Sequence, residues 1–98
     1  MNEHRTQNPG KLKELVEKLD QELDGSHNYA GHFPHGDRHG LVGYDIFFYG
    51  NYFFPRTKQE LERHDLEIES LSFDCWEYKD GVNFKVLVTE RDREIKEL

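Results

Sequence analysis

The apolar residues near the start of the chain repeat with the period of an amphipathic helix. Leucine and valine recur every three or four residues, at Leu12, Leu15, Val16, Leu19 and Leu23. Asn8 is a suitable N-cap, Pro9 suits the first helical position, and Gly25 supplies a left-handed stop. The pattern therefore predicts a helix that begins at Pro9, ends before Gly25 and packs its apolar stripe on the core.

Residues 41–49 alternate with the period of two that is typical of a strand, with Phe48 on one face and Phe47 on the other. Gly50-Asn51 is a two-residue turn signal, so residues 52–54 are expected to return beside this strand as a hairpin. Both faces of the predicted hairpin carry aromatic side chains near the turn.

Residues 29–33 form a shorter alternating stretch upstream, with Tyr29 and Phe33 predicted on one side and His32 on the other. Residues 35–40 contain two glycines and are expected to turn the chain. The histidines of this region are therefore predicted in or beside a loop.

Thr57, followed three residues later by Glu60, matches a capping box and predicts a short helix from Lys58 to about Asp65. Its apolar stripe is thin, and His64-Asp65 reads as an exposed helix end. From there the pattern changes to alternation, which indicates that a strand replaces the helix.

The last apolar stretches predict a second hairpin, with strands at residues 67–78 and 82–89 joined by Lys79-Asp80-Gly81. A three-residue loop with a glycine bulge sets Trp76 opposite Phe84.

These elements predict a single α+β domain over residues 1–98. An N-terminal helix packs on a largely antiparallel sheet made of two hairpins, with a short second helix between them. A chain of 98 residues is long enough for one core and no more. Residues 1–7 and 91–98 are polar and are expected to fray.

The formal net charge of −7 disfavours direct binding to nucleic acid or to anionic membrane surfaces, and it favours a partner with a basic surface. Cys75 is the single cysteine, so no intrachain disulfide can form, and a packed structural role is expected for it. The N-terminus has no apolar leader and no run is long enough for a membrane span, so a cytoplasmic location is expected.

Four potential metal ligands, His32, His35, Asp37 and His39, fall within eight residues. Imidazoles and a carboxylate suit zinc or another transition metal, although a glycine-rich loop does not ensure that they converge. The other interpretation is a polar loop with solvated histidines. The same residues support an alternative function, a small metal- or His-dependent enzyme of the phosphodiesterase or nuclease type.

Aromatic residues concentrate in residues 26–55, which hold nine of the thirteen in the chain. Aromatics are the residues from which binding hot spots are usually built. The leading hypothesis is a non-enzymatic inhibitor or regulator, needing no cofactor, that blocks a protein through an aromatic patch in an acidic surround. Small phage-type anti-defence proteins fit that description, and a homodimer is compatible with it. The predicted partner-binding residues are Phe47, Tyr49, Tyr52, Phe53, Phe54, Glu67 and Glu69.

Overall fold

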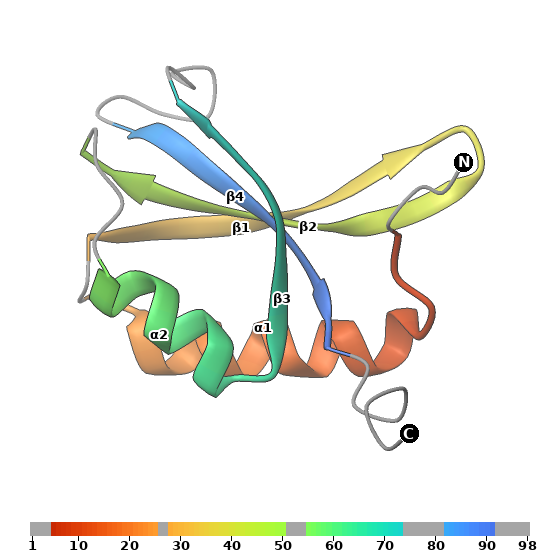
Figure 1. Ribbon diagram of the computed structural model, residues 1–98, viewed down its shortest axis with the longest axis horizontal. Coiled ribbons are helices and arrows are strands. Elements are labelled where there is room, and N and C mark those ends of the chain that lie inside the picture. Colours follow the sequence, from red (N-terminus) through yellow and green to blue (C-terminus); the bar gives the residue numbers. More distant parts are fainter. Residues whose placement is uncertain (1–4, 26–27, 51–54, 74–81, 92–98) are drawn as a thin grey trace.

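A computed structural model of the chain describes residues 5–25, 28–50, 55–73 and 82–91. Their elements follow in the order α1 (Pro9–Leu23), β1 (Tyr29–Asp37), β2 (Gly40–Tyr49), α2 (Pro55–Arg63), β3 (Leu66–Phe73) and β4 (Val82–Glu90). The strands form one antiparallel sheet in the order β1-β2-β4-β3. Figure 1 shows both helices on the same side of this sheet. The predicted α+β class, with a short helix between two hairpins, is confirmed.

The first helix forms where the apolar period predicts it. The side chain of Asn8 accepts a hydrogen bond from the amide of Lys11, and Pro9 occupies the first turn. The leucines and the valine of the predicted stripe are buried or half-buried against the sheet. Gly25 has a positive φ of 80°, as expected for the stop after the helix.

The residues just before α1 are held in place, although fraying is predicted for them. Thr6 is buried, and its hydroxyl donates to the carboxylate of Glu90 at 2.5 Å. The other oxygen of that carboxylate accepts from the amides of Gln7 and Asn8, both at 2.8 Å. Glu90 therefore fixes the entry into α1, and local sequence patterns cannot reveal a contact across 84 positions.

β1 is longer than predicted, because it continues through Pro34 to Asp37 and the chain turns only at Arg38-His39. A proline lacks the amide proton that a central strand needs for its ladder. β1 is an edge strand and has a ladder partner on one side only, so Pro34 is tolerated there.

A bulge near the start of β1 changes which of its side chains share a face. The pairing shifts between Tyr29 and Gly31, leaving Ala30 as the extra residue. Tyr29 and His32 consequently lie on the helix side, whereas Phe33 lies on the opposite face. The predicted grouping of Tyr29 with Phe33 is therefore wrong.

β2 is a central strand whose alternation is as predicted from Gly43 to Phe48, with Phe48 on the helix side and Phe47 on the opposite face. A register shift between Gly43 and Leu41 interrupts it, and Leu41 packs against the core. Both edges of β2 are hydrogen-bonded, one to β1 and the other to β4. The predicted hairpin with residues 52–54 therefore has no free edge of β2 to pair with. Residues 51–54 themselves lie outside the described ranges.

α2 begins at Pro55 and not after Thr57 as predicted. Proline suits the first turn, because the amide at that position has no intrahelical partner. Thr57 lies inside the helix and is buried. The side chain of His64, predicted to be exposed, is only 9% exposed.

β3 and β4 pair in a register that differs from the predicted one. Phe73, and not Trp76, lies opposite Phe84, and a bulge after Ile68 shifts the pairing along the strands. Turn chemistry predicts a register only where the loop is assigned correctly, and the β3 bulge adds a shift that the turn residues do not reveal. Residues 74–81, which include Trp76, are not among the described ones.

The core lies between the sheet and the two helices. At its centre Phe48 stacks on Phe84 with ring centroids 5.2 Å apart, and Tyr29 meets Phe48 edge-on. The buried apolar side chains of this cluster are Leu12, Val16, Leu19, Leu23, Tyr29, Ile46, Phe48, Leu61, Leu66, Phe84, Val86 and Val88.

Neither helix of the described chain is long and apolar enough to cross a membrane. The predictions that residues 1–4 and 92–98 fray and that Cys75 packs in a strand concern segments that the structure does not describe.

Candidate functional site

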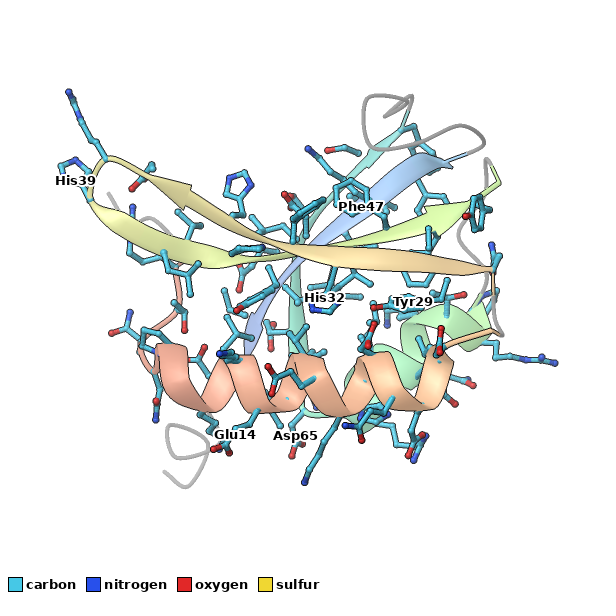
Figure 2. The ribbon with its side chains drawn as sticks, turned by 180° about the vertical axis from the view of Figure 1, so that it is seen from behind. Glu14, Tyr29, His32, His39, Phe47 and Asp65 are labelled. Atoms are coloured by element: carbon cyan, nitrogen blue, oxygen red, sulfur yellow. The ribbon has the colours of Figure 1, made fainter. Side chains whose placement is uncertain are left out.

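The face of the sheet that points away from the helices carries an aromatic pair. Phe33 from β1 meets Phe47 from β2 edge-on, with ring centroids 6.2 Å apart. Phe47 is only 7% exposed, whereas Phe33 is 49% exposed. In Figure 2, Phe47 lies on the side of the sheet opposite to α1. We call this surface the open face, because neither described helix covers it.

A histidine and a carboxylate form a hydrogen-bonded pair beside this aromatic pair. Nδ1 of His35 lies 2.9 Å from Oδ2 of Asp45. The Asp45 side chain is 10% exposed and that of His35 is 42% exposed. In the sheet register Asp45 lies between Phe33 on β1 and Leu87 on β4, so the carboxylate is enclosed while the imidazole reaches solvent.

The predicted acidic residues lie along one end of the open face. Glu69, at the β3 bulge, accepts a hydrogen bond from the Thr89 hydroxyl at 2.7 Å. Glu67 is directly opposite Thr89 in the register, and its carboxylate lies 3.8 Å from the guanidinium of Arg91. Both glutamates therefore share a face as predicted, and each already has a partner within the chain.

The other predicted partner-binding residues divide between two regions of the chain. Phe47 is on the open face, and Tyr49 ends β2, half-buried. Tyr52, Phe53 and Phe54 belong to the segment that the structure does not describe, so their predicted role stays a prediction.

His32 belongs to a different cluster, on the helix side of the sheet. The hydroxyl of Tyr29 donates to Oδ1 of Asp20 on α1 at 2.5 Å and lies 3.0 Å from Nδ1 of His32. The same Nδ1 lies 3.3 Å from Oδ1 of Asp20. Figure 2 shows His32 between the sheet and α1. The cluster ties the edge strand to the helix, which is a sufficient structural role.

Asp37 and His39 lie at the far end of the first hairpin, where Figure 2 shows His39 at the tip. Asp37 accepts from the guanidinium of Arg5 at 2.6 Å and from the amide of His39 at 2.8 Å. The guanidinium first, and then the amide, lowers the pKa of the Asp37 carboxyl. Because that pKa is lowered, this contact stabilises the fold above the ordinary aspartate pKa of about 3.9 and is lost as the pH falls.

The four predicted metal ligands are thus not brought together. His32 faces α1, His35 is on the open face, and Asp37 and His39 are at the hairpin tip. Metal binding by this stretch stays a prediction that the arrangement does not favour. The sequence pattern missed two residues of the open face, Phe33 and Asp45. Asp45 is two residues from Phe47, so the alternation of β2 places both side chains on one face. The sequence did not show that Phe33 and His35 of β1 lie beside them.

Comparison with known proteins gives no relative from which a role could be transferred: no family model, curated protein or solved structure matches the chain.

Proposed function

We propose that the chain is a non-enzymatic binding protein that docks a protein partner on the open face of its sheet. One observation supports this most directly. Phe33 is half exposed on a sheet face that neither described helix covers, and it rests on the buried Phe47. A rigid aromatic side chain of this kind loses little conformational entropy when a partner covers it.

The chemistry around Phe33 favours a partner that is apolar at its centre and basic at its rim. Leu87 on β4 adds an apolar side chain on the far side of Asp45, and Glu67 and Glu69 lie at one end of the face. The net charge of −7 would steer a basic partner toward the protein and raise its association rate at low salt. An inhibitor or regulator acts by such occlusion and needs no chemistry of its own.

Phe33→Ala is expected to weaken binding to the physiological partner by roughly thirtyfold or more, which is the usual size for a hot-spot aromatic. The partner is first captured from the source organism with immobilised wild-type protein. Its dissociation constant is then measured by isothermal titration calorimetry. The matched control is Leu71→Ala, because Leu71 is 38% exposed but is paired with the buried Val86 on the helix side. Equal losses in the two variants would show that the open face is not the docking surface.

The His35–Asp45 pair favours a second candidate function, acid–base catalysis. An enclosed carboxylate that orients a solvent-facing imidazole is the arrangement that general bases use. A small phosphodiester enzyme would follow from it. On our leading proposal, His35 gives the enclosed Asp45 carboxylate a hydrogen-bond partner next to the aromatic pair.

Turnover of a generic phosphodiester, bis(p-nitrophenyl) phosphate, distinguishes the two candidates. We expect wild type and His35→Gln to give the same background rate across pH 5–9, with and without added divalent metal, on the binding proposal. A rate that is lost in His35→Gln and in Asp45→Asn, while His39→Gln retains it, would favour the enzyme instead.

A further inference from the structure

Three side chains that bind metals in other proteins converge where the ends of the two helices meet. Glu22 comes from the last turn of α1, Glu60 from the last turn of α2, and His64 directly follows α2. One ligand atom from each of them lies within 4.8 Å of the others. Glu60 and His64 are four residues apart, and the amide of His64 still donates to the carbonyl of Glu60, so both side chains leave the same helical face.

Nε2 of His64 has no hydrogen bond of good geometry inside this cluster. Its side chain is only 9% exposed, and Nε2 is buried without a hydrogen bond. A buried unsatisfied polar atom costs free energy and is uncommon in native proteins. Nε2 lies 3.4 Å from Oε1 of Glu22, close to it but not in hydrogen-bond geometry.

That distance matches the spacing of two ligand atoms around a tetrahedral zinc ion. Zinc binds imidazole nitrogen and carboxylate oxygen at about 2.0–2.2 Å, so two such atoms at the tetrahedral angle are about 3.4 Å apart. A zinc ion placed between Nε2 of His64 and Oε1 of Glu22 would therefore bind both without a shift of either helix. It would also give the orphan nitrogen a partner.

The guanidinium of Arg63 already lies against both carboxylates of this cluster, but a metal ion could displace it. Nη2 of Arg63 lies 2.5 Å from Oε1 of Glu22 and 2.8 Å from Oε1 of Glu60. The Arg63 side chain is 56% exposed, and exposed ion pairs of this kind are weak. The two carboxylates are thus already positioned around a cation.

We propose that Glu22, Glu60 and His64 bind a divalent transition-metal ion of the zinc class, and that Arg63 competes with it for the two carboxylates. An imidazole with two carboxylates suits such an ion, and solvent on the Glu22 side provides the fourth ligand. The bound metal would crosslink the end of α1 to the end of α2. This site is separate from the open face, and the proposal does not depend on the proposed function.

Because Arg63 competes with the metal ion, removal of its side chain should strengthen metal binding, and this tests the proposal. Zn²⁺ is titrated into untagged protein by calorimetry at neutral pH. Arg63→Ala is expected to bind Zn²⁺ roughly tenfold more tightly than wild type, since the ion no longer displaces a guanidinium. His64→Ala and Glu60→Gln are each expected to lose more than roughly a hundredfold in affinity. His39→Ala, which changes a histidine at the exposed hairpin tip, should leave the affinity as it is.

Two further measurements keep the test decisive if His64→Ala proves unstable. Glu60→Gln keeps the shape of the side chain, and circular dichroism melting establishes that the variant is folded. Co²⁺ bound to Arg63→Ala should show the intense visible absorption of a tetrahedral site, and Glu60→Gln should abolish it. The proposal fails if Arg63→Ala binds no more tightly than wild type, or if His39→Ala reduces Zn²⁺ affinity as much as Glu60→Gln does.

Discussion

Gly43→Ala is expected to lower the free energy of unfolding by roughly 1–3 kcal/mol, the usual cost of overpacking a tight site. Gly43 lies in β2 opposite His35 and is buried. A Cβ at this position would lie 2.4 Å from the carbonyl oxygen of Val88 and 3.1 Å from a methyl group of Leu87. The first of these atoms belongs to the backbone of β4, so the two central strands must move apart to accept even a methyl group.

Gly10→Ala is the matched control, because it adds the same methyl group where there is room. Gly10 is in the first turn of α1, and the nearest atom to an added Cβ is the Asn8 side chain at 3.9 Å. Alanine is a better helix former, so this variant should gain roughly 0.5–1 kcal/mol. Urea unfolding followed by circular dichroism measures both changes. If Gly43→Ala proved as stable as Gly10→Ala, the packing of β2 on β4 would be looser than the structure shows.

The elements that sequence predicted well are those whose signals are local. The helix from Pro9 to Leu23 has a cap, an apolar period and a stop within one short stretch. The alternation predicted for β2 is found in the fold from Tyr44 to Phe48, because the pairing of these residues with β4 is regular. The fold class and the order of helices and strands follow from such signals, since each element must bury one apolar face.

The errors arise where pairing between distant segments decides the outcome. Nothing near residues 41–49 indicates that β4 takes the edge on which residues 52–54 were expected. The bulges at Ala30 and after Ile68 each reverse a strand's faces, and a bulge leaves little trace in an alternation this short. The strand was predicted to end at Phe33, and the position of β1 at the sheet edge explains why it can continue through Pro34.

The same limit applies to the candidate sites. The aromatic density directed attention to β2, whose Phe47 is on the open face. Its exposed partner Phe33 could not be assigned to that face until the β1 bulge was known. His64 was predicted to be exposed, because a thin apolar stripe on α2 does not reveal that α1 covers its end.

Phe48→Ala is expected to cost roughly 3–5 kcal/mol, the range for deleting a buried phenylalanine. Phe48 is fully buried, stacks on Phe84 at 5.2 Å and receives the edge of Tyr29 at 6.1 Å. Alanine removes the hydrophobic contribution of the ring and both aromatic contacts, and it leaves a cavity between sheet and helix. A domain of this size has about 5–15 kcal/mol of stability in total, so this one change removes a large fraction of it.

Phe33→Ala provides the comparison that separates stability from binding. The two phenylalanines lie on opposite faces of the sheet, and Phe33 is half exposed, so its removal should cost less than about 1 kcal/mol. Thermal melting should show a fall of more than roughly 12 °C for Phe48→Ala and of a few degrees for Phe33→Ala. Phe33→Ala should weaken binding to the partner more than Phe48→Ala does, when binding is measured at a temperature where both variants are folded. If Phe33→Ala also melts by more than about 12 °C below wild type, Phe33 is a core residue covered by the rest of the chain, and the open face is not available to a partner.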